Sequence, residues 1–180
     1  MSSRLSWTLL MVWAVVLLAA MLVYGQRQLS VFDPESRLLY ASTNPDFDQR
    51  VVSLLNTYGI TGANIVHIGT QSQCYCEWLT TAHQTQLINT LDSAQYSIAQ
   101  VTIEALPALQ QLLPSIPALI VIDDNNQLRY LGPYSTGYGC FTGKTLVQEI
   151  AAYTTQLPYT GAVINTDAEG CFCPSSSSNN

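Results

Sequence analysis

Hydrophobic residues are first concentrated in one unbroken segment near the start of the chain. Residues 7–25 (WTLLMVWAVVLLAAMLVYG) contain no charged side chain. A helix of this length spans roughly the 30 Å hydrocarbon core of a bilayer. Trp7 and Tyr24 stand near its ends, where amphipathic rings favour the membrane interface. We expect an N-terminal stub, 1–6, and then an uncleaved anchor. The alternative is a cleaved secretory signal, although this apolar stretch is long for one and no clean cleavage site follows.

Beyond a polar juxtamembrane linker at 26–44, the pattern alternates between amphipathic and continuously apolar segments. From Phe47, apolar residues recur at i, i+4, i+7, i+8 and i+11, which predicts a helix over 44–59. Past residue 156 the pattern fades, so 157–180 is expected to be a cysteine-containing tail whose serine-rich end is disordered. The other expected elements are strands at 62–69, 95–103, 116–123 and 127–134 and helices at 77–91, 104–116 and 144–156.

Composition narrows the function classes. The 180 residues have a net charge of −6, and Lys144 is the only lysine. Phosphate recognition needs clustered Lys and Arg, so nucleic acid is excluded as a partner. Hydrophobic residues make up 48% of the chain, enough to build the core of one domain.

Four of the five cysteines form two C-x-C pairs, in QSQCYCEW and EGCFCP. Cys74 and Cys76 precede or begin the predicted helix at 77–91. A helix N-terminus stabilises a thiolate, which is the reactive form of cysteine. We expect Cys74 to attack as the nucleophile and Cys76 to resolve the intermediate. Two residues at i and i+2 also come close enough for a direct disulfide.

The remaining cysteines have two interpretations each. Cys171 and Cys173 follow the last predicted helix and are expected to be a mobile resolving pair, or else staples of the tail or partners of Cys140 without a redox role. Cys140 lies in a glycine-rich loop that either approaches the Cys74 region or buries the thiol as a small apolar side chain. An odd number of cysteines leaves at least one thiol unpaired in a monomer.

Metal binding is the main alternative use of these cysteines. Paired thiolates chelate soft ions, so the sequence also permits a copper, zinc or iron–sulfur site. Its ligands would be Cys74, Cys76, Cys171 and Cys173, with Cys140 as a fifth contributor. Neither pair has the C-x2-C spacing that is typical of zinc ribbons.

The order of predicted elements resembles the thioredoxin-like fold over residues 45–156, an α/β fold with a central mixed sheet flanked by helices. The strand SIPALIVID begins 41 residues after Cys74. The resemblance implies that Pro117, preceded by Ile116, is a cis proline facing the cysteines. It also suggests that His67 is a buried group that aids proton transfer, although a satisfied core histidine is the alternative. The C-x-C spacing departs from the C-x-x-C of that family, and the chain is also similar to an uncharacterised family of membrane-anchored, thioredoxin-like bacterial proteins.

These features lead to three functional hypotheses. The first is a thiol–disulfide oxidoreductase without a cofactor that acts on protein thiols or disulfides. It is a single-pass protein of the bacterial inner membrane with its soluble domain in the periplasm, because cysteine pairs suit an oxidising compartment. The second is a soft-metal binding or delivery protein that uses the same cysteines. The third is a redox-inert interaction module. His83, the other histidine besides His67, is expected to face solvent.

Overall fold

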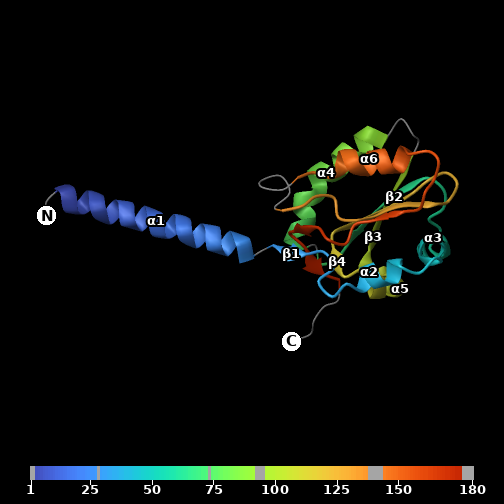
Figure 1. Ribbon diagram of the computed structural model, residues 1–180, viewed down its shortest axis with the longest axis horizontal. Helices are drawn as coiled ribbons and strands as arrows, with labels where there is room; N and C mark the ends of the chain where they lie inside the picture. The colour runs from blue at the N-terminus through green and yellow to red at the C-terminus, as the bar shows by residue number, and fades with distance from the viewer. Residues whose placement is uncertain (1–2, 28, 73, 92–95, 138–143, 176–180) are drawn as a thin grey trace.

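A computed structural model describes residues 3–27, 29–72, 74–91, 96–137 and 144–175. Its elements follow the predicted order, with short additions at both ends (Figure 1). The helix predicted over 104–116 is shorter than expected, because a 3-10 turn precedes it and a short strand follows it. The helices are α1 (Ser3–Arg27), α2 (Arg37–Ser42), α3 (Phe47–Thr57), α4 (Tyr75–Leu91), η2 (Ile103–Ala105), α5 (Pro107–Leu112) and α6 (Val147–Thr155). The strands are β1 (Ser30–Val31), β2 (Asn64–Gly69), β3 (Ser97–Thr102), β4 (Ser115–Ile116), β5 (Ala118–Ile122), β6 (Leu128–Gly132), β7 (Val163–Ile164), β8 (Glu169–Gly170) and β9 (Cys173–Pro174).

The main sheet is mixed and five-stranded, in the order β3-β2-β5-β6-β7. Strand β2 runs parallel to β3 and antiparallel to β5, and β5 runs antiparallel to β6. Strand β6 is therefore parallel to β2. The residues that follow β2 and those that follow β6 consequently lie at the same end of the sheet.

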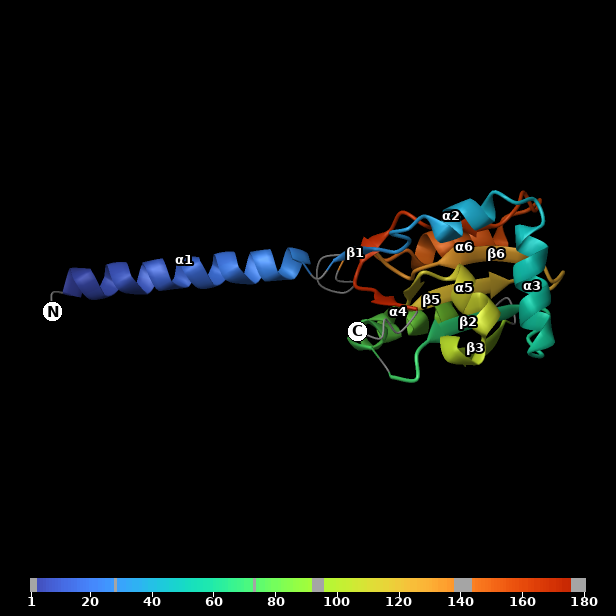
Figure 2. The ribbon, with the colours of Figure 1, turned by 90° about the horizontal axis from the view of Figure 1, so that it is seen from below.

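Helices cover both faces of this sheet, because successive side chains of a strand point to opposite sides. One core cluster joins Val66 and Ile120 to helices α2, α3 and α5. The other joins Ile65 and Leu119 to helices α4 and α6. Figure 1 shows α4 and α6 on one side of the sheet and α2 and α5 on the other, and Figure 2 shows the face that α2 and α5 cover. The structure is accordingly an α/β protein with a mixed sheet and helices.

Segments on either side of 45–156 take part in the fold. In the segment after 156, β7 extends the main sheet beside β6, β8 pairs with β1, and β9 pairs with β4. Helix α2 lies within the expected linker and packs against the core through Leu38, which is fully buried. The two-residue strands β7, β8 and β9 have no hydrophobic periodicity of their own, so sequence patterns could not reveal them.

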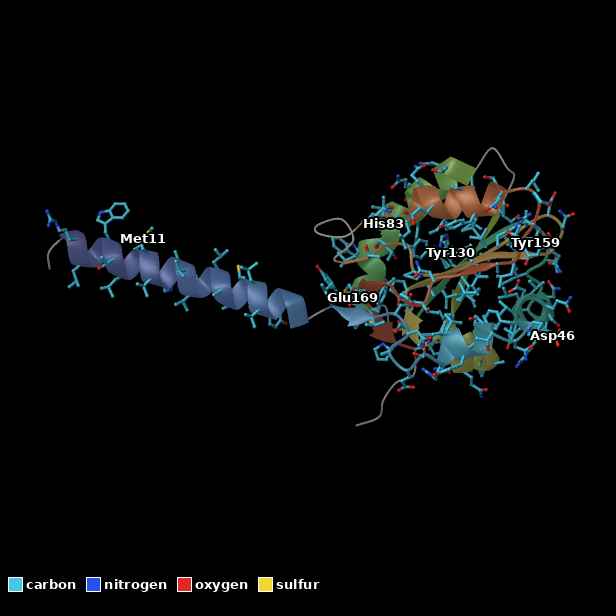
Figure 3. The ribbon with its side chains drawn as sticks, viewed as in Figure 1. Met11, Asp46, His83, Tyr130, Tyr159 and Glu169 are labelled. Atoms are coloured by element: carbon cyan, nitrogen blue, oxygen red, sulfur yellow. A yellow bond between two sulfur atoms is a disulfide. The ribbon has the colours of Figure 1, made fainter. Side chains whose placement is uncertain are left out.

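The N-terminal helix projects away from the rest of the chain (Figure 1). Its segment Arg4–Tyr24 is long and apolar enough to cross a membrane, and none of it is buried in the protein. Strand β1 follows soon after and lies beside β8 at the near end of the domain. Figure 3 shows Glu169 of β8 at this end, whereas Asp46 and Tyr159 lie at the opposite end.

Candidate functional site

The loop between β2 and α4 presents the first C-x-C pair. Cys74 immediately precedes the helix, and its carbonyl oxygen accepts a hydrogen bond from the Glu77 N–H at 2.9 Å. The Glu77 carboxylate in turn accepts hydrogen bonds from the N–H and the hydroxyl of Thr70, both at 2.8 Å. A Cβ atom on Gly69 would lie 2.5 Å from a Glu77 carboxylate oxygen. A glycine at 69 therefore allows Glu77 to hold the cysteine loop against the helix start.

The second C-x-C pair is held against the same end of the sheet by backbone hydrogen bonds. The Gly137 N–H donates to the Glu169 carbonyl at 2.6 Å, and the Cys171 N–H donates to the Gly137 carbonyl at 3.1 Å. Cys173 pairs with Ile116 in the β4–β9 ladder. The second pair is thus placed on the domain by its own backbone and does not depend on the disulfides alone.

The four cysteines form two disulfides that cross-link the C-x-C segments. Cys74 is bonded to Cys173, with a Cα–Cα distance of 6.6 Å, and Cys76 to Cys171, with a distance of 5.4 Å. The structure does not contain the direct Cys74–Cys76 bond that the spacing permits. The tail pair, expected to be mobile, is bonded into the site. Equal spacing in the two motifs allows this arrangement, because two antiparallel segments then bring both pairs into contact.

The two disulfides differ in accessibility. Cys74 is half-buried and borders a cavity of about 790 Å³, whose walls include Tyr75, Trp78 and Pro117. Cys76 is only 7% exposed, whereas Cys171, like Cys74 and Cys173, is half-buried. It borders, with Cys171, a cavity of only about 10 Å³. We call Cys74–Cys173 the outer disulfide and Cys76–Cys171 the inner disulfide.

Pro117 links the two cavities. The Ile116–Pro117 peptide bond is cis, as the sequence comparison implied. Pro117 borders the large cavity together with Cys74 and the small cavity together with Cys76. The predicted convergence of the proline and the cysteines is therefore present.

The loop after β6 also reaches the site, as the parallel arrangement of β2 and β6 predicted. Tyr134, Ser135 and Gly137 border the small cavity beside Cys76. Cys140, which was expected in the continuation of this loop, lies outside the described residues.

His67 and Tyr134 form a buried polar pair beneath the cysteines. The Tyr134 hydroxyl lies within hydrogen-bond distance of His67 Nδ1. Burial raises the pKa of Tyr134 well above 10, so the hydroxyl is protonated, and which of the two groups donates depends on the tautomer of His67. Desolvation lowers the pKa of His67 to about 4, so its ring is neutral at pH 7. Its Nε2 has no hydrogen-bond partner within the described part of the chain.

The prediction for His83 was wrong. Its side chain is 6% exposed, and burial lowers its pKa. Figure 3 shows His83 on α4, the helix that begins at the cysteines. It lies seven residues after Cys76 and four before Leu87, both of which are buried on the same face of the helix. That spacing is the signal that would have identified His83 as an inward-facing residue.

Sulfur proximity is the property that gives this centre its chemistry. The Sγ atoms of Cys74, Cys76 and Cys173 all lie within 4.8 Å of one another, and Cys171 is bonded to Cys76. In the oxidised form, such a cluster can undergo thiol–disulfide exchange with an incoming thiolate. If both disulfides were reduced, four thiolates would stand where a soft metal ion could bind.

Fold and site together define a mixed-sheet α/β protein that carries a double disulfide at one end of its sheet. Residues 43–175, well over half of the chain, match a family described as a domain of unknown function, DUF6436. The chain belongs to this family. No curated protein and no solved structure matches it.

Proposed function

We propose that this protein is a membrane-anchored thiol–disulfide oxidoreductase with a thioredoxin-like fold that exchanges its outer disulfide with protein thiols. The observation that carries the proposal is the position of the Cys74–Cys173 disulfide. It lies at the N-terminus of α4, borders a cavity of about 790 Å³, and has the cis proline Pro117 on the wall of that cavity. The mixed sheet and the order of its elements support the assignment of the fold.

The exchange reaction follows from thiol chemistry. A partner thiolate attacks Sγ of Cys74, the Cys74–Cys173 bond breaks, and Cys173 leaves as a thiolate. A second thiolate of the partner then attacks the partner sulfur of this mixed disulfide and releases the Cys74 thiolate. The partner has lost two electrons and gained a disulfide, while Cys74 and Cys173 have each gained one electron. The positive end of the α4 dipole stabilises the Cys74 thiolate, which makes it a good leaving group.

His67 and Pro117 are the supporting residues in this proposal. His67 borders the large cavity with Cys74, and its ring is neutral at pH 7. A neutral imidazole accepts a proton from an incoming thiol and returns it to a departing thiolate. Pro117 contributes to the cavity wall that a partner chain would contact, while Ile116 before it is fully buried and pairs with Cys173.

The anchor determines where the proposed reaction takes place. Ser30 pairs with Gly170, the residue before Cys171. The six residues from Tyr24 to Ser30 span at most about 20 Å, so the disulfides lie close to the membrane surface. We place the soluble domain in the periplasm of a bacterium, with the anchor in the inner membrane, because an oxidising compartment preserves disulfides. The proposed partners are proteins with thiols near that surface.

Soft-metal binding is the second candidate function, and the clustered sulfurs favour it. Three Sγ atoms within 4.8 Å of one another, with Cys171 adjacent, form a thiolate donor set once both disulfides are reduced. In this alternative, copper, zinc or an iron–sulfur cluster is held by the C-x-C pairs. A redox-inert interaction module is the remaining alternative.

The two functions are separated by trapping and by metal analysis on the full-length chain in lipid nanodiscs. With disulfide-containing periplasmic proteins as substrate, the free Cys74 thiolate of Cys173→Ser should attack a partner disulfide and accumulate mixed disulfides at Cys74, which peptide mass spectrometry identifies. The matched control, Cys74→Ser with Cys173→Ser, should form none at this position. Stoichiometric metal bound to the anaerobically reduced wild type, without any mixed disulfide in Cys173→Ser, would replace the oxidoreductase by the metal function. If neither a mixed disulfide nor bound metal is found, the redox-inert interaction module remains as the function.

A further inference from the structure

The inner disulfide is closed to a protein partner at Cys76, whereas its other half, Cys171, is half-buried. Cys76 is 7% exposed, and the cavity beside Cys76 and Cys171 has a volume of only about 10 Å³. An attacking thiolate must reach a sulfur atom along the axis of the disulfide, which a partner chain cannot do at Cys76 through so small a space. The outer disulfide, by contrast, borders the large cavity through Cys74.

The inner disulfide does lie next to the sulfurs of the outer one. Sγ of Cys76 is within 4.8 Å of the Sγ atoms of both Cys74 and Cys173. When the outer disulfide is reduced, it therefore leaves two thiol groups beside the inner bond. The sulfur atoms that would react next are already neighbours, because one residue separates the cysteines within each C-x-C segment.

We propose that the Cys76–Cys171 bond is a second redox site that exchanges only through Cys74 and Cys173. This inference rests on the proposed function and gives the centre a capacity of four electrons rather than two. The inner disulfide can oxidise a second partner dithiol, and it does so by exchange with the cysteines of the outer disulfide, which react with the partner directly.

The relay consists of two exchanges after a first partner has reduced the outer disulfide. The Cys74 thiolate attacks Sγ of Cys76, a Cys74–Cys76 bond forms, and Cys171 leaves as a thiolate. The Cys173 thiolate then attacks Sγ of Cys74, which restores the outer disulfide and releases the Cys76 thiolate. Two electrons have moved inward, no electron is gained or lost overall, and a second partner dithiol can now be oxidised. The thiolates of Cys171 and Cys76 take up the two protons that Cys74 and Cys173 release.

The intermediate of this relay is the bond that the sequence spacing permits. Residues at i and i+2 can approach within the Cα separation of about 4.4–6.8 Å that a disulfide requires. The Cys74–Cys76 bond is thus a transient species in the relay, whereas the oxidised protein has the cross-linked pairs of the structure.

The relay is tested by counting electrons in the full-length chain in nanodiscs. A reduced dithiol protein is added in steps, samples are quenched with an alkylating reagent, and each cysteine is assigned by peptide mass spectrometry. The wild type should take up four electrons. If the relay is slow, alkylated thiols appear first at Cys74 and Cys173 and later at Cys76 and Cys171; if it is fast, this order is not seen. At substoichiometric reductant and equilibrium, a Cys74–Cys76 cross-link should be detectable. A wild type that stops at two electrons would overturn the relay while leaving the proposed function intact.

Two variants separate direct reduction of the inner bond from reduction by relay. In Cys74→Ser with Cys173→Ser, the inner disulfide should be reduced at least tenfold more slowly than in the wild type. In Cys76→Ser with Cys171→Ser, the outer disulfide should accept two electrons only. Equal rates for the inner disulfide in the first variant and in the wild type would overturn the relay. Dithiothreitol is run as a second reductant, so that the order of the two sites is measured even if protein dithiols fail to react and the proposed function fails.

Discussion

Removing the two disulfides separately and together should have strongly non-additive effects on stability. The bonds Cys74–Cys173 and Cys76–Cys171 close loops of nearly equal length, with sequence separations of 99 and 95. In the chain-entropy model, a loop of about 100 residues stabilises the folded state by about 4.7 kcal/mol. Once that loop is closed, however, the second bond closes only a small ring made of the two C-x-C segments.

The magnitudes follow from the same relation. A ring of about six residues contributes about 2 kcal/mol, so either single removal should lower the free energy of unfolding by about 2 kcal/mol. Loss of both disulfides should cost about 7 kcal/mol, which is comparable with the whole stability of an ordinary domain. The double removal should therefore cost more than three times a single one.

Urea unfolding of the full-length chain in detergent measures these differences, with alanine replacing both members of each pair. The wild type in excess reductant serves as a control for the variant that lacks all four cysteines. Single removals that each cost 4–5 kcal/mol, or a double removal equal to twice a single one, would refute the reasoning from nested loops.

Three further predictions concern residues around the sheet. Burial lowers the pKa of His67 to about 4, below its value of about 6.5 in the unfolded chain. The contribution of His67 to stability is therefore complete above pH 6.5, falls as the pH drops from 6.5 to 4 and then levels off. His67→Gln should make urea midpoints less dependent on pH in this range. Gly69→Ala should displace the Glu77 carboxylate, and hydrogen exchange at the amides of the cysteine loop should become faster, with unchanged exchange counting against the contact. Arg129 and Asp123 form a buried ion pair with a 2.6 Å contact. Arg129→Met should therefore lower the free energy of unfolding by about 3–5 kcal/mol, because it leaves the Asp123 charge buried and unpaired. Replacing both residues by apolar ones should cost less, and equal losses in the two variants would contradict this.

The sequence predicted those parts of the molecule whose signal is local. The helix from Phe47 was found because its apolar residues recur with the helical period, and the strand after Pro117 because it is a short continuous apolar run. The cis bond at Pro117 was implied by resemblance and is present. The three short strands after residue 156 were missed because each consists of two residues whose partners lie far away in sequence.

The site was predicted less completely than the fold. The positions of Cys74 and Cys76 at a helix start follow from local pattern. Their bonds to Cys173 and Cys171 depend on where the tail returns, and no local pattern encodes this. The burial of His83 could have been predicted, since it shares a helix face with Cys76, but its polarity favoured a solvent-facing interpretation.

The central claim is that the Cys74–Cys173 disulfide exchanges with protein thiols. The most direct measurement is a time course in which the full-length oxidised chain in nanodiscs meets a reduced dithiol protein, with both species quenched by alkylation and analysed by mass spectrometry. The account predicts that two cysteine thiols of the centre appear for each partner disulfide that forms, at the same rate, and that in Cys76→Ser with Cys171→Ser both of these thiols are at Cys74 and Cys173. A partner that stays reduced, with Cys74 and Cys173 still bonded after the partner is in large excess, would contradict it.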